Sequence, residues 1–176
     1  MTTSHRRPAH DEPGLESVDV VDDTDTVTRT VTRAEMRAGR LRHRAVFIGV
    51  VHPDGRVLVH QRSHAKDVWP GMWDLAVGGV VNAGERYDEA AARELAEEIG
   101  VADAPLRLIG GGAFRDESVD LIGRCYTVVT AGPFHFADGE VIQAEWVLLP
   151  ALTTMISERE FLPDSVALLL PLLLNG

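Results

Sequence analysis

The chain has 176 residues, 45% of them hydrophobic and 25% charged, which is typical of a globular domain and not of a disordered or fibrous chain. Seventeen Lys and Arg against 27 Asp and Glu give a net charge of −10. Such an acidic chain is not expected to bind a nucleic-acid polymer or an anionic membrane surface, because phosphate groups repel it. The single cysteine, Cys125, excludes an intramolecular disulfide and a multi-cysteine zinc site.

The N-terminal region predicts a tail followed by one domain. Residues 1–14 are polar, contain two prolines and show no periodicity, so we expect a flexible tail there and a single domain over residues 15–176. The first ten residues do not resemble a secretory signal, and the longest apolar run, residues 166–174, is too short to span a bilayer. We therefore expect a cytoplasmic protein.

The first predicted elements of the domain are short. Strands are expected at residues 18–21 and 26–31, and a short helix follows that ends near Gly39. Thr32 and Glu35 form a capping-box pattern, which places the start of this helix.

The rest of the chain predicts a mixture of strands and helices without strict alternation. A turn at Pro53-Asp54-Gly55 lies between two strands that are expected to pair as a hairpin, and a longer helix ends at Gly100. The order of elements predicts one mixed α/β (α+β) domain with a sandwich-like arrangement. The expected elements of this part are strands at residues 45–51, 56–61, 75–77, 106–114, 121–129 and 141–149, and helices at 86–99, 150–157 and 163–173.

The segment from Arg29 to Arg44 is locally basic, although the chain as a whole is acidic. It holds six arginines and one acid, Glu35, whereas residues 45–176 hold nine basic and nineteen acidic residues. Two interpretations stay open: a solvated helical face, or a patch that meets substrate phosphates or a partner chain.

Three glutamates in the long predicted helix carry the chemistry. Glu94, Glu97 and Glu98 are three and four residues apart, so they lie on one face of the helix, where like charges repel. Three clustered carboxylates are typical of a site for Mg²⁺ or Mn²⁺. Arg93 lies inside the cluster and can orient a carboxylate through a two-pronged contact, and Glu85 precedes the helix at the positive end of its dipole.

This segment resembles the Nudix box, G-x5-E-x7-R-E-U-x-E-E-x-G-U with U aliphatic, at every fixed position from Gly79 to Val101. The resemblance implies a Nudix hydrolase with an α/β/α sandwich and a mixed central sheet. It further implies that water attacks a phosphorus of a nucleoside diphosphate linked to another group. The implied residues are Glu94, Glu97, Glu98, Arg93 and Glu85 as the catalytic set, with the three helix glutamates and the carbonyl of Gly78 as ligands to Mg²⁺ or Mn²⁺.

The general base stays open at this point, because the family uses either a box glutamate or a glutamate on a distant loop. Glu94 is the candidate within the box. Glu117 and Glu140 are the loop candidates, and each is also explained as a simply solvated acid.

Residues 42–78 resemble the subgroup related to isopentenyl-diphosphate isomerase. That resemblance implies that Arg62 and Lys66, the single lysine of the chain, bind the diphosphate of the substrate. Three features of the isomerase are missing, however. Its catalytic cysteine has no counterpart in residues 74–79, one of its two metal histidines falls on Met36, and its acidic pair falls near Leu121 and Gly123.

We therefore favour a metal-dependent hydrolase of a small-molecule diphosphate on an isomerase-like scaffold. The alternatives are a sensor that binds a nucleotide or sugar phosphate without cleaving it, and an isomerase that lacks its usual cysteine. The partner is expected to be the substrate, with no nucleic acid and no membrane. The apolar C-terminal segment packs either within the chain or across a homodimer interface, so a homodimer is left open.

Overall fold

The computed structural model describes residues 14–66, 68–136 and 139–176, so the predicted tail lies outside the described residues apart from Gly14. No helix in these ranges is both long enough and apolar enough to cross a membrane. The strands are β1 (Ser17–Val21), β2 (Val27–Thr32), β3 (His43–Val51), β4 (Arg56–Arg62), β5 (Trp73–Asp74), β6 (Val77–Val80), β7 (Arg107–Arg115), β8 (Asp120–Val129) and β9 (Val141–Leu148). The helices are α1 (Arg33–Gly39), α2 (Tyr87–Ile99), α3 (Leu149–Glu158), α4 (Pro163–Leu168) and α5 (Leu170–Leu174).

Strand β3 organises the mixed central sheet. It pairs in parallel with β8 along its whole length, from His43↔Leu121 to Val51↔Val129, and antiparallel with β6 between Ala45↔Val80 and Ile48↔Val77. Strand β7 extends the sheet beside β8, and the β1–β2 hairpin contacts β3 at Val20↔His43. The sheet therefore combines parallel and antiparallel pairs, as predicted.

The expected hairpin between β3 and β4 is wrong over most of its length. The two strands pair at Val51↔Val57, next to the turn. Further along, β6 pairs with β3, and β4 diverges to pair antiparallel with β9 and with β5. A turn sequence fixes the start of a hairpin, but the other segments of the sheet decide how far the pairing extends.

Two other elements differ from the prediction. The strand expected at residues 75–77 is wrong at its first two residues, because Leu75 and Ala76 form a buried link between β5 and β6 and the strand begins at Val77. The single helix expected over residues 163–173 is two helices, α4 and α5. Pro171 has no backbone N–H to donate inside a continuous helix, and the chain instead begins a new helix at Leu170, with the proline in its first turn.

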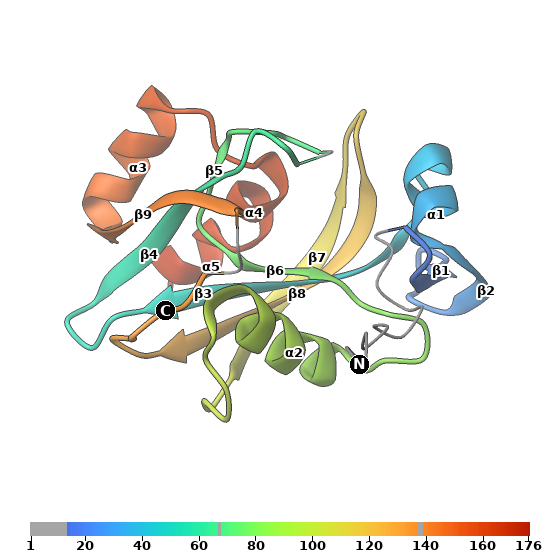
Figure 1. Ribbon diagram of the computed structural model, residues 1–176, viewed down its shortest axis with the longest axis horizontal. Coiled ribbons are helices and arrows are strands. Elements are labelled where there is room, and N and C mark those ends of the chain that lie inside the picture. Colours follow the sequence, from blue (N-terminus) through green and yellow to red (C-terminus); the bar gives the residue numbers. More distant parts are fainter. Residues whose placement is uncertain (1–13, 67, 137–138) are drawn as a thin grey trace, which may run out of the picture.

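The core has two layers, one on each face of the sheet. Val46, Ile48 and Val50 of β3 pack on the side of α2, whereas Ala45 and Phe47 pack on the side of α3, α4 and α5. This alternation is the two-residue period of a strand buried on both faces. Figure 1 shows α2 on one side of the sheet and α3 to α5 on the other, with the β1–β2 hairpin and α1 gathered at one end. The arrangement is an α/β/α sandwich.

The packing of α2 leads to a stability prediction. Leu95 is 1% exposed in the layer between α2 and the sheet. We expect Leu95→Ala to lower the free energy of unfolding by about 2–5 kcal/mol, because the truncation leaves a cavity. Urea denaturation followed by circular dichroism measures this change. The matched control is Leu108→Ala on β7, where the leucine is 50% exposed, and a loss as large as that of Leu95→Ala would contradict the layer assignment.

Candidate functional site

A cleft of about 900 Å³ opens between α2, α1 and the loop after β4. It is the larger of the two pockets described here. Its acidic wall is formed by Glu94, Glu97 and Glu98 of α2, and the backbone of Gly78 and Gly79 in β6 lies beside them. The other charged residues that line it are Glu16, Arg33, Arg37, Arg40, Arg62, Lys66, Asp74, Arg93, Asp120, Glu140 and Asp164.

Helix α2 presents its acidic face to the cleft because its apolar face is buried on the sheet. Ala91, Leu95 and Ile99 are each at most 1% exposed, and Gly100 ends the helix in a left-handed conformation that suits glycine. Strand β6 approaches the helix so closely that a Cβ at Gly79 would lie 2.6 Å from Oε1 of Glu94. A side chain at this position would displace the carboxylate, which explains the glycine.

Arg93 joins the acidic groups of the site. Its Nε and Nη2 donate to the two carboxylate oxygens of Glu85 at 2.9 and 3.0 Å, and its Nη2 also donates to the Val80 carbonyl at 3.2 Å. Its Nη1 donates to Oε1 of Glu94 at 2.8 Å and to Oε2 of Glu97 at 3.1 Å. One guanidinium therefore ties the start of the helix, its acidic face and β6 together.

The carboxylates beside Arg93 respond differently to their surroundings. Burial alone would raise the pKa of Glu85, but the hydrogen bonds from Arg93 and from the Asn82 N–H bring that pKa below its ordinary value. Burial raises the pKa of Glu94, and Arg93 opposes this rise only in part. Burial and the charge of Glu94 together raise the pKa of Glu98 to about 8.

The donor set suits a hard divalent cation. The carboxylate of Glu98 is buried beside Glu94 and accepts a hydrogen bond from the Gly78 N–H at 3.3 Å, so its ionised form has little compensation from the protein. Oxygen donors of this kind favour Mg²⁺ or Mn²⁺ over softer metals. Within the described ranges, no three His, Cys, Asp or Glu side chains already converge on a single point. Arg93 draws Glu94 and Glu97 toward itself, so a cation would have to compete with this guanidinium for their oxygens.

The predicted phosphate-binding residues and one loop acid lie together. Lys66 and Arg62 both line the cleft, and Nζ of Lys66 lies 2.7 Å from Oε1 of Glu140, which lines it too. Glu117 is not among the cleft-lining residues. Its side chain is exposed, and its backbone carbonyl accepts a hydrogen bond from Nη1 of Arg40 at 2.8 Å.

Sequence reasoning missed three buried acids in the cleft, Asp74, Asp120 and Asp164, which are 7%, 9% and 6% exposed. Asp74 accepts a hydrogen bond from the Ala76 N–H, and Asp164 lies in the first turn of α4. The sequence Leu162-Pro163-Asp164 predicted the start of α4 and gave no indication of a site. His43 lines the cleft as a buried side chain whose Nδ1 contacts the Leu41 carbonyl at 2.9 Å.

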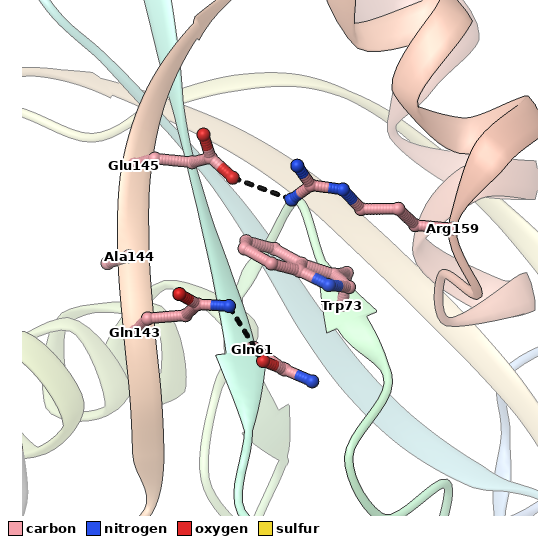
Figure 2. A pocket seen from close by; sticks show the side chains of 6 residues that line it. All are labelled: Gln61, Trp73, Gln143, Ala144, Glu145 and Arg159. Carbon is pink, nitrogen blue, oxygen red and sulfur yellow. Dashed lines mark hydrogen bonds and ion pairs between the residues drawn. The ribbon is translucent and has the colours of Figure 1, made fainter.

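A second pocket, of about 460 Å³, has a different character (Figure 2). Arg159 lies over the ring of Trp73, 4.6 Å from its centroid, and pairs with Glu145 at 2.7 Å. Nε2 of Gln143 donates to Oε1 of Gln61 at 2.9 Å. The polar groups drawn in Figure 2 thus largely satisfy one another, and the candidate site is the larger cleft.

Comparison with known proteins assigns the chain to a family. A sequence model of the NUDIX domain matches residues 41–165. The chain belongs to the Nudix family. A Nudix hydrolase of Yersinia pestis is 39% identical over 152 residues, covering 86% of this chain and 82% of the relative. The Nudix hydrolase YfcD of Escherichia coli K12 is 38% identical over 151 residues, covering 86% and 83%.

Solved structures share the Nudix fold with this chain. DR0079 from Deinococcus radiodurans has a TM-score of 0.75 at 24% identity, covering 91% of this chain and 98% of that chain. The NUDIX domain of NrtR from Shewanella oneidensis, crystallised with ADP ribose, has a TM-score of 0.59 at 19% identity, covering 82% and 98%. The predicted fold class is therefore confirmed.

The network of Arg93 leads to a prediction about stability. We expect Arg93→Lys to lower the free energy of unfolding by about 1–3 kcal/mol, because an ammonium group cannot form the two-pronged contact with Glu85 and also reach Glu94 and Glu97. Urea denaturation in EDTA measures the change. Arg86→Lys is the control, since this arginine is 73% exposed and pairs with Asp88 at 3.5 Å. Equal losses in the two variants would show that Arg93 does not join the site.

Asp164 leads to a prediction about pH. Burial and the charge of Asp74 raise the pKa of Asp164 to about 7. Between about pH 4 and pH 7 the folded state therefore holds a proton that the unfolded state releases, and this group makes the free energy of unfolding fall as the pH rises. We expect Asp164→Asn to remove this fall. From pH 5 to pH 8, the free energy of unfolding of the variant should therefore rise by about 1 kcal/mol or more relative to that of the parent.

Urea midpoints at pH 5, 6, 7 and 8 in EDTA measure this difference. Glu158→Gln is the control, because it removes an exposed carboxyl at the end of α3, and its profile is expected to follow that of the parent. A difference between Asp164→Asn and the parent that stays constant with pH would contradict the prediction.

Proposed function

We propose that the protein is a metal-dependent pyrophosphohydrolase that cleaves a nucleoside diphosphate linked to another group. One observation carries this proposal: the carboxylates of Glu94, Glu97 and Glu98 line the same cleft as the cations Arg62 and Lys66. Carboxylates alone would repel a diphosphate. Together with a divalent cation and basic side chains, they form a site that neutralises and positions it.

The residues that would hold the metal are Glu94, Glu97, Glu98 and the carbonyl of Gly78. When bound, Mg²⁺ or Mn²⁺ supplies Lewis acidity and a bound water of lowered pKa. Arg93 and Glu85 keep the acidic face of α2 directed at the cleft through the contacts described above. Because burial leaves Glu98 and Glu94 poorly compensated, binding a cation relieves an unfavourable charge as well as serving the chemistry.

Arg62 and Lys66 bind the diphosphate in this proposal. Lys66 is paired with Glu140, so an incoming phosphate exchanges one anionic partner of the lysine for another. Water is activated by Glu94 or by Glu140, since both line the cleft. Glu117 is the weaker candidate for the base, because its side chain is exposed and does not line the cleft.

The alternative functions are a non-catalytic sensor and an isomerase. An isomerase needs an acid or thiol next to the substrate, and Cys125 does not meet this need. It is fully buried in the layer of α3 to α5, and burial raises its pKa to about 12. Two predictions from the sequence stay predictions: a single domain over residues 15–176 and a cytoplasmic location. Whether the chain forms a homodimer stays open.

The proposal is tested by hydrolysis. With Mg²⁺ or Mn²⁺, the protein is expected to release a monophosphate product from at least one compound among nucleoside triphosphates, nucleotide sugars, dinucleoside polyphosphates and ADP ribose, the last being the ligand of the NrtR domain. EDTA should abolish turnover. Glu98→Gln should lower kcat by about a hundredfold or more, through loss of charge stabilisation at the reacting phosphate.

Glu158→Gln is the matched control for this assay, since it removes an exposed carboxyl far along the sequence from the box, and it should retain the activity of the parent. Isothermal titration with Mg²⁺ and Mn²⁺ gives a second readout. Tight nucleotide binding without product would favour the sensor, and conversion of isopentenyl diphosphate to dimethylallyl diphosphate would favour the isomerase. Absence of both turnover and metal binding in the folded protein would refute the proposal.

A further inference from the structure

One wall of the cleft comes from a segment that precedes the matched family domain. The NUDIX match begins at residue 41, whereas the β1–β2 hairpin and α1 lie before it. Arg33 and Arg37 are one turn apart on α1 and both line the cleft, as does Arg40 directly after the helix. The three arginines therefore lie at the site itself, which favours the phosphate-binding interpretation of this basic segment over a solvated face.

Packing fixes α1 beside the acidic wall. Met36 of α1 and Val18 of β1 are almost fully buried against Val80 of β6. The carbonyl of Val80 in turn accepts a hydrogen bond from Arg93, the residue that holds the carboxylates of α2. A complete capping box between Thr32 and Glu35 sets the start of the helix. The position of the arginines relative to the α2 carboxylates is thus set by the core and not by a mobile loop.

The cations reach the cleft from two different elements, Arg33 and Arg37 from α1, and Arg62 and Lys66 from the end of β4 and the loop after it. The α1 arginines lie toward Glu94, because Met36 of α1 packs against Val80, and Gly79, the residue before Val80, lies beside the Glu94 carboxylate. Glu98 lies one residue further from Val80 along β6 than Glu94, because the Gly78 N–H donates to its carboxylate at 3.3 Å. A ligand that contacts both groups of cations needs negative charge at more than one place along its length.

The acid that pairs with Arg33 leaves the arginine side chain partly exposed. Arg33 pairs with Glu16 at 2.8 Å, and both side chains are partly exposed, at 29% and 40%. An exposed pair of this kind is weak and screened by water, so its guanidinium is available to a phosphate that enters the cleft. Arginine suits this task, because its planar fork matches two phosphate oxygens.

We propose that Arg33 and Arg37 form a second phosphate-binding site at the Glu94 end of the cleft. This site rests on the proposed function, in which Arg62 and Lys66 bind the diphosphate from the loop after β4. A substrate that uses both groups of cations carries a chain of three or more phosphates, with its middle beside the carboxylates. The N-terminal hairpin and α1 would then select for the length of the phosphate chain, while the family core supplies the machinery for cleavage.

The test measures binding separately from turnover. The probes are a nucleoside triphosphate with methylene groups in place of its bridging oxygens and the matching methylene diphosphate, titrated calorimetrically into the full-length protein with Mg²⁺. The parent is expected to bind the triphosphate analogue more tightly. The double variant Arg33→Gln/Arg37→Gln should weaken the triphosphate analogue by about tenfold or more, and the diphosphate analogue by less than about twofold.

The control is Arg29→Gln/Arg107→Gln, which removes the same net charge from two exposed positions that do not line the cleft. It should leave both affinities unchanged. Arg37→Gln alone keeps the Arg33–Glu16 pair and guards against loss of folding, and it should show a smaller loss specific to the triphosphate. Arg37→Lys should restore part of that loss.

Equal weakening of both analogues, no weakening relative to the control, or a parent that binds the triphosphate no more tightly than the diphosphate would each overturn the second site. Failure of the proposed function looks different. In that case the parent hydrolyses no compound of the panel, yet the methylene probes still report whether the α1 arginines distinguish chain length. If the parent hydrolyses a compound of the panel but the α1 variants bind both analogues as the parent does, the hydrolase proposal holds and the second phosphate site is refuted.

Discussion

The arrangement of the site depends on one guanidinium that offsets the repulsion between buried carboxylates. A helix that turns Glu94, Glu97 and Glu98 to one face places like charges within a turn of each other, and burial raises the pKa of Glu94 and of Glu98, so the ionised forms of these two are costly. Arg93 reduces this cost by dividing its donors among Glu85, Glu94, Glu97 and a strand carbonyl. Among the contacts of the described residues, Arg93 does not donate to Glu98, and in the proposed function this imbalance is what a divalent cation would relieve. Carboxylates fully paired with cationic groups of the protein would have a low affinity for a metal ion.

The scaffold explains how such a face is kept open to ligand. Helix α2 is held by small and aliphatic side chains against the sheet, and the glycines of β6 let the strand backbone approach the carboxylates directly. The opposite layer, α3 to α5, encloses Cys125 and contributes Asp164 to the cleft from the far end of the sequence. Helix α1, together with Gly14 and Glu16, lines a further side of the cleft. Acidic and basic side chains therefore line the same cleft.

Several elements follow from local sequence. The helix predicted over residues 86–99 is observed at Tyr87–Ile99 and ends at Gly100 as expected, and the capping box of Thr32 and Glu35 is present. Strand pairing was less predictable. The turn at residues 53–55 suggested a hairpin, yet β4 pairs mainly with β9, because β6 takes part of the edge of β3. The last predicted helix is divided at Leu169, because Pro171 has no backbone N–H to donate inside a continuous helix.

The sequence by itself determined the acidic face, its supporting arginine and the family, because residues three and four apart on a helix are neighbours whatever the rest of the chain does. Only the tertiary structure decided which distant groups meet that face. It brought Asp74 and Asp164 into the cleft, placed Glu140 beside Lys66 while leaving Glu117 exposed, and packed α1 against β6 so that its arginines face the carboxylates. These positions depend on loops and strand pairings between segments far apart in the chain, and such contacts are set by burial of the whole core and not by local periodicity.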